Sequence, residues 1–346
     1  MKKFLLIAVL FFALAIPANA ADITAPPAPG SAQDLMPPEQ ESFGEGLWFV
    51  IKSAVQALEP DIAQAGRTCL AVVAVVLLTS LLGSFPGRTK SVTELSCAVA
   101  LGSMLLRSAG SMISTAVSTI QELSTYGKLL LPVMTTAMAA QGGITSSAAL
   151  YTGTAVFDSI LSSLIESMLI PMVYVFIALA TANSALGEDL LKKIRDFVKW
   201  LISWCLKIIL YIFTGYMGIT GVISGTADQA ALKAAKLTIS GAVPVVGGIL
   251  SDASETILVS AGMVKNAVGI YGVLAVLAIA IGPFLKIGVE YLMLKLTAAV
   301  CGVFASKRTS ELIQDISGAM GLLLAMTGTV CLLLLISTVC MLKGVS

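Results

Sequence analysis

The chain has 346 residues, of which 57% are hydrophobic and only 12% charged, with a formal net charge of +1. Soluble domains carry about 25% charged residues, so this composition excludes an ordinary soluble protein and predicts one that resides in a lipid bilayer. The near-neutral charge gives no electrostatic basis for binding nucleic acid. There is no histidine, which excludes Ser-His-Asp and Cys-His catalysis and zincin sites, so we do not expect an enzyme.

The N-terminal residues 1–20 are typical of a secretory signal peptide. A basic start at Lys2 and Lys3 precedes an apolar run, and Ala18 and Ala20 form a small-x-small cleavage site. The alternative is an uncleaved membrane anchor, and both place the next residues outside the cytoplasm. Residues 21–45 hold five prolines, five acidic residues and no lysine or arginine, which predicts an extended extracytoplasmic linker.

Residues 46–60 are expected to form an interfacial amphipathic helix. Leu47, Val50 and Ala54 fall on one helical face, while Trp48 and Lys52 suit the headgroup region.

Residues 69–346 are predicted to form a polytopic membrane domain. Apolar runs and basic turns indicate an all-α protein with about six principal transmembrane helices, arranged as three hairpins. Under the positive-inside rule, the basic residues near 88–90, 192–199 and 307–308 mark cytoplasmic turns. The predicted spans are 69–85, 92–113, 155–185, 200–222, 267–286 and 319–342.

Shorter segments leave alternatives open. The Gly/Pro-flanked runs 129–140 and 237–250 are short for a crossing and are candidates for re-entrant elements. The run 292–304 either continues the preceding helix or crosses by itself, which would reverse the side of the C-terminus. The basic stretch 188–200 is either an interfacial cytoplasmic helix or the water-exposed end of the next transmembrane span.

An internal tandem repeat is indicated for residues 129–222 and 237–342. Pro132 and Pro171 are 39 residues apart, and so are Pro244 and Pro283. Each second proline lies in a long apolar run that leads to a basic turn.

A few charged residues interrupt the apolar runs and are candidates for a polar interior, because a charge in hydrocarbon is costly. Asp158 and Glu166 are eight residues apart, which places both carboxylates on nearly one helix face. The alternative is that they lie at the membrane boundary or pair across helices with Lys207 or Arg107. The full set is Glu94, Arg107, Asp158, Glu166, Lys207 and Glu290.

Two glycine series have the small-residue spacing that allows close helix packing. This spacing fits two alternatives, contact between copies in a homo-oligomer and packing of helices within one chain. The series are Gly215, Gly218, Gly221 and Gly225, and Gly318 with Gly321. The six cysteines lie in apolar runs without a C-x-x-C motif, so we expect no bound metal and no other cofactor. No phosphate-binding loop occurs in the sequence, so we do not expect this chain to hydrolyse ATP.

One segment is specific enough to suggest a family. ISGAVPVVGGILSDA at 239–253 is followed by VKNAVG at 264–269 and by an apolar run to Pro283 and Lys286. With the signal peptide, the acidic lead and the multi-span body, it resembles the stage III sporulation protein AE family of endospore-forming bacteria.

That resemblance implies a membrane subunit of the channel or secretion-like complex that links mother cell and forespore and supports late forespore development. The partners would be the other subunits of the stage III sporulation A complex, including a separate ATPase, and a forespore membrane protein. The location would be the mother-cell-derived outer forespore membrane.

The family segment itself has helix-breaking residues, and we expect it to line a protein–protein seam or a pore entrance. Its candidate residues are Pro244, Gly247, Gly248, Ser251 and Asp252, where the last two can cap the helix that follows. The alternative function is an autonomous secondary transporter or permease, which the repeat and the acidic residues within apolar runs also fit.

Overall fold

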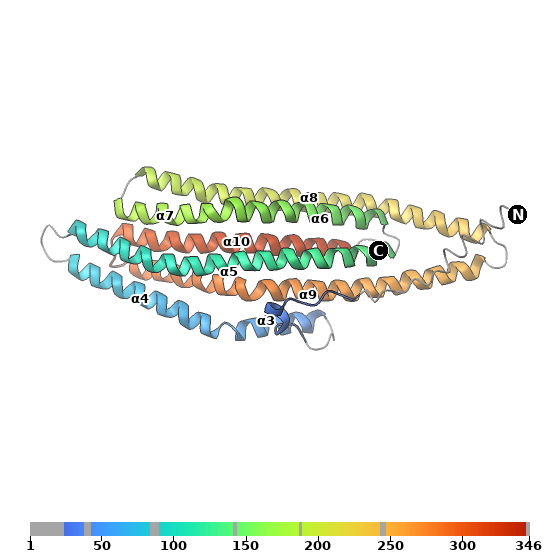
Figure 1. Cartoon of the computed structure of the whole chain (residues 1–346), viewed down its shortest axis with the longest axis horizontal. Helices are drawn as coiled ribbons and strands as arrows, with labels where there is room; N and C mark the ends of the chain where they lie inside the picture. Colours follow the sequence, from blue (N-terminus) through green and yellow to red (C-terminus); the bar gives the residue numbers. More distant parts are fainter. Residues whose placement is uncertain are drawn as a thin grey trace.

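A computed structural model describes residues 24–37, 43–83, 90–140, 144–186, 189–242 and 247–343. For 82–83, 90–94, 144, 146, 189, 221–242, 247–265 and 343 it describes only the helical backbone. Its helices form one elongated antiparallel bundle (Figure 1). They are α2 (Gly30–Gln33), α3 (Phe43–Gln56), α4 (Glu59–Gly83), α5 (Lys90–Ala140), α6 (Ile144–Leu164), the π-helical turn η1 (Ile165–Leu169), α7 (Ile170–Leu186), α8 (Asp189–Ala242), α9 (Gly247–Cys301) and α10 (Lys307–Lys343).

Six apolar stretches of the described chain are long enough to cross a membrane. They are Glu59–Leu81, Leu95–Ala140, Ser147–Leu186, Leu190–Thr220, Asn266–Cys301 and Lys307–Leu342. An α-helical span needs about 20 residues, and each of these stretches exceeds that length. The predicted fold class, an all-α multi-pass membrane protein with about six principal helices, is confirmed.

Several expected boundaries differ in the structure. Residues 129–140 do not form a separate element but continue α5, with Pro132 inside the helix; α5 ends at Ala140, just before Gly142 and Gly143. Residues 292–301 likewise continue α9, so this stretch is not an independent crossing. Residues 237–242 complete α8 and α9 begins at Gly247, whereas Pro244 lies outside the described residues.

Helices α5, α8 and α10 all begin at the same end of the bundle, on the left in Figure 1. We call this the basic end, because Lys192, Lys193 and Arg195 open α8 while Lys307 and Arg308 open α10. The arrangement places two of the predicted basic turns side by side in space, together with the start of α5.

Helix α10 is the centre of the bundle. It packs against α9, α5, α7, α8 and α6, and a row of its apolar side chains is fully buried: Met320, Leu323, Met326, Val330 and Leu334. Helices α4 and α8 lie at the periphery, where only 22% of each apolar stretch is buried. The apolar core is therefore continuous through the middle of the bundle.

The described part of the proline-rich segment lies against the bundle. The backbone N–H of Ala28 donates to the Tyr271 hydroxyl of α9 at 3.3 Å, and the Tyr126 hydroxyl of α5 donates to the Pro26 carbonyl at 3.4 Å. Helix α3 packs against α9 as well. The N-terminal segment thus covers the α5–α9 side.

The contact between α6 and α8 predicts one sharp stability difference. A Cβ added to Gly153 of α6 would lie 2.0 Å from Cε1 of Tyr216, whose ring is anchored by a hydrogen bond from its hydroxyl to the Ala149 carbonyl. Overpacking of this kind costs about 1–3 kcal/mol. We expect Gly153→Ala to lower the thermal denaturation midpoint of the detergent-solubilised protein.

Gly110 of α5 is the matched control, because nothing lies within 4 Å of a Cβ added there. Gly110→Ala should leave the midpoint unchanged or raise it, since alanine is the better helix former. Equal midpoints for the two variants would contradict the α6–α8 packing described here.

Candidate functional site

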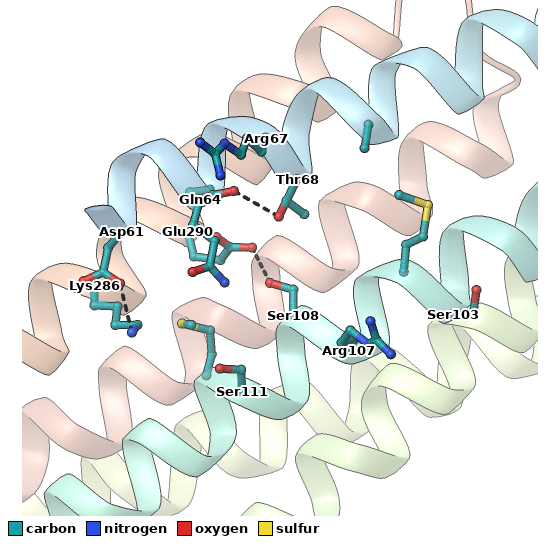
Figure 2. Close-up of a pocket in the computed structure, with 14 residues that line it drawn as sticks. Asp61, Gln64, Arg67, Thr68, Ser103, Arg107, Ser108, Ser111, Lys286 and Glu290 are labelled. Carbon is teal, nitrogen blue, oxygen red and sulfur yellow. Dashed lines mark hydrogen bonds and ion pairs between the residues drawn. The ribbon is translucent and has the colours of Figure 1, made fainter. Parts of the chain in front are cut away.

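A cavity of about 790 Å³ opens between α4, α5 and α9 (Figure 2). Its wall is unusually polar for a bundle of apolar helices. The polar lining residues are Asp61, Gln64, Arg67 and Thr68 from α4, Ser103, Arg107, Ser108 and Ser111 from α5, and Lys286 and Glu290 from α9.

Two polar contacts hold the three helices around the cavity. The Lys286 ammonium lies 2.9 Å from Oδ1 of Asp61, which joins α9 to α4. The Ser108 hydroxyl donates to Glu290, which joins α5 to α9, and Glu290 is only 5% exposed. Both contacts are drawn in Figure 2. They fix the relative positions of the groups that face the cavity.

Two arginines at this cavity have guanidinium groups available for a ligand. Arg67 and Arg107 have exposed side chains, line the cavity, and form no ion pair with any other residue that the structure describes. Together with Lys286 they give three cations against two carboxylates. Guanidinium groups bind carboxylate and phosphate groups in a bidentate manner, so the arrangement suits an anionic group.

The structure brings together two of the six charged residues predicted to form a polar interior, Arg107 and Glu290. Asp158 is elsewhere: it is 4% exposed and accepts a hydrogen bond from Ser124 of α5 at 2.8 Å. Glu166 is exposed and accepts from Gln121 of α5 at 3.1 Å, and Lys207 is exposed on α8. The side chain of Glu94 lies outside the described residues.

The two glycine series differ in their surroundings. Gly318 and Gly321 face side chains of the same chain, Lys199 and Tyr291, at 3.3 and 3.5 Å from an added Cβ. Gly215 and Gly218 of α8 face open space, with nothing within 4 Å. Gly221 and Gly225 belong to the described backbone of α8.

The family segment is only partly described. Gly247, Gly248, Ser251 and Asp252 lie in the first turns of α9, and its expected role at a seam or pore entrance stays a prediction.

Sequence reasoning did not propose three charged cavity residues as site residues, namely Asp61, Arg67 and Lys286. The first two precede the span expected at 69–85, whereas α4 begins at Glu59. A signal was present: Asp61, Gln64, Arg67 and Thr68 share one helical face, and Lys286 is four residues before Glu290. Helix α9, which is distant in sequence, must pack against α4 and α5 before this pattern becomes a site.

A second charged cluster lies at the basic end and was also missed. The buried Arg195 of α8 pairs with Asp315 of α10 and with its neighbour Asp196 at 2.8 Å, and Lys192 lies 3.7 Å from Glu311. These contacts join α8 to α10. The segments 191–197 and 311–316 are therefore in contact.

No group of three His, Cys, Asp or Glu side chains in the described part of the chain could hold a metal ion. All six cysteines are free thiols.

The Arg195–Asp315 pair predicts a large effect of one truncation. Asp315→Ala leaves a buried guanidinium without its partner on α10, which should destabilise the protein by about 3–5 kcal/mol. Asp196→Ala, which removes an exposed carboxylate (58% exposed side chain), should cost at most about 1 kcal/mol. Thermal denaturation of both variants in detergent measures the difference, and similar losses would contradict the buried pairing.

The cavity also predicts a pattern of chemical access. In a cysteine-free variant, Ser111→Cys should react with a water-soluble thiol reagent, because Ser111 lines the open cavity. Val72→Cys should not react, because Val72 of α4 is fully buried. Labelling yields in native membranes test this, and protection of Ser111→Cys would show that the cavity is closed to water.

Comparison with known proteins gives the family. The family model for stage III sporulation protein AE matches residues 39–344. A curated relative, stage III sporulation protein AE of Bacillus subtilis (strain 168), is 25% identical over 236 residues, which cover 68% of this chain and 59% of that protein. No solved structure matches. Because the family match extends over most of its length, the chain belongs to the stage III sporulation protein AE family.

Proposed function

We propose that this protein is a membrane subunit of a sporulation-specific, secretion-like channel complex that links mother cell and forespore and is required for late forespore development. Its family supports a role in sporulation, and its six long apolar helices support a multi-pass membrane protein. The proposed location is the mother-cell-derived outer forespore membrane. The role is structural and non-enzymatic.

The observation that carries this proposal is the placement of polar groups. The centre of the bundle is filled by the apolar side chains around α10, whereas the polar groups of α4, α5 and α9 gather in a cavity at the side. A hydrophilic cargo needs a polar path. We infer that such a path forms between this chain and other chains, and not through the middle of one copy.

The proposed partners are the other subunits of the stage III sporulation A complex, including a separate ATPase, and a protein of the forespore membrane. The chain has no phosphate-binding loop of its own, which fits an energy source on another subunit. Arg67 and Arg107 of the lateral cavity offer a binding place for an anionic group of a partner.

The alternative function is an autonomous secondary transporter or permease. The same cavity favours it, because the Asp61–Lys286 pair and the buried Glu290 are charges within apolar helices, and such charges often mark substrate or ion pathways. In that case the cavity would bind a small anionic substrate.

One pair of experiments separates the two functions. The tagged chain, extracted from membranes of sporulating cells, should co-purify with an ATPase and with further membrane subunits. The chain purified alone in liposomes should not accumulate small anions under an ion gradient. Gradient-driven uptake by the purified chain that Arg107→Gln abolishes, without co-purifying subunits, would favour the transporter.

The proposed orientation places the basic end in the cytoplasm, because Lys and Arg near span ends are retained there. In intact cells that express a cysteine-free variant of the protein, Lys193→Cys at this end should be protected from a membrane-impermeant thiol reagent. Asn266→Cys should be labelled, because α9 reaches the opposite end near Leu342 of α10. The reverse pattern would invert the topology.

A further inference from the structure

Two charged side chains lie on the outer surface of the apolar bundle, away from the lateral cavity. Lys207 of α8 and Glu166 of η1 are both exposed, and Lys207 forms no ion pair with another described residue. An exposed charge on a lipid-facing helix is costly. Each of these groups would therefore gain from a partner of opposite charge supplied by another molecule.

The two charges lie at the same depth in the bundle. Helices α6 and α8 run antiparallel, and Phe157 contacts Phe213 with ring centroids 5.3 Å apart. Glu166 follows Phe157 by nine residues, so it lies level with the residue nine before Phe213, which is Trp204. Lys207 is three residues from Trp204, a displacement of about 4–5 Å along the axis.

The same two charges point to different sides of the bundle. Glu166 accepts a hydrogen bond from Gln121 of α5, so it lies on the α5 side of α6. Lys207 shares the outer face of α8 with exposed aromatic residues, while Phe213 and Met217 face inward. Those aromatic residues are Trp200, Trp204 and Tyr211, at 55%, 48% and 71% exposure. The two charges are thus placed to meet between copies.

Both surfaces also permit close helix approach. On α8, Gly215 and Gly218 continue the outer face beyond Lys207 and meet nothing within 4 Å. On α6 and η1, Ser159, Ser163 and Ser167 are exposed at four-residue spacing around Glu166. Small residues in this pattern let membrane helices pack backbone to backbone. Glu166 itself lies in a π-helical turn, a feature frequent at functional sites.

We propose that the outer face of α8 in one copy of this chain packs against the α6–η1 face of the next copy, with Lys207 paired to Glu166. The interface is heterologous, because its two sides are different surfaces of the same chain. The equal depth of the two charges keeps successive copies level in the bilayer. Such a contact generates a ring in the membrane plane when its rotation closes.

A second copy is the occupant because one chain carries both complementary halves, with opposite charge at matching depth and small residues on each side. The inference concerns self-assembly and does not depend on the proposed conduit role. Its test therefore needs no sporulation phenotype.

The test uses the full chain, expressed with two different affinity tags and extracted in native nanodiscs. Lys207→Glu and Glu166→Lys, each expressed alone, should reduce co-purification of the two tagged forms by about tenfold. Lys193→Glu, an exposed lysine on the same helix near the basic end, is the matched control and should have no effect.

Co-expression of the two single variants in the same cells is the decisive experiment. Lys207→Glu copies then carry two carboxylates and Glu166→Lys copies two ammonium groups, so alternating copies restore both pairings. Co-purification of one variant with the other should return to within about twofold of wild type. Undiminished self-association of either variant, or failure of the mixed pair to recover, would overturn the proposal; misfolded variants could not rescue each other.

Discussion

The constraint on which this structure depends is that hydrocarbon offers no partner for a backbone N–H or C=O group. Every crossing segment must satisfy these groups internally, and helices do so. The described chain accordingly forms long, uninterrupted helices, with α10 as the axis around which α5, α6, α7, α8 and α9 pack. Side-chain packing among these helices then decides which faces are buried and which face outward.

Within this frame several charged side chains have a definite consequence. Arg195 with Asp315 and Lys286 with Asp61 tie α8 to α10 and α9 to α4, so these charges position helices. Arg67 and Arg107, at the cavity, and Lys207, on the outer face, have no ion-pair partner among the described residues. These three side chains are suited to bind other molecules, which fits a protein that works in an assembly.

The fold class followed from the sequence because long apolar runs, separated by short basic turns, are direct consequences of the bilayer as solvent. The length of α5 did not, because the polar stretch 114–128 separates two apolar runs, 92–113 and 129–140, which one continuous helix joins in the structure. The cavity required the tertiary structure: Arg107 and Glu290 could be named singly, but Asp61 and Lys286 are 225 residues apart and meet only after α4 packs on α9. Gly215 and Gly318 have similar sequence contexts and opposite surroundings, a difference that spacing alone does not encode.

We propose that this protein acts as a subunit of a multi-chain membrane assembly. The most direct measurement is the mass of the particle that contains it, obtained by mass photometry after detergent-free extraction from membranes of sporulating cells. This particle should hold several chains. A particle that contains a single chain, isolated from cells that sporulate normally, would contradict this proposal.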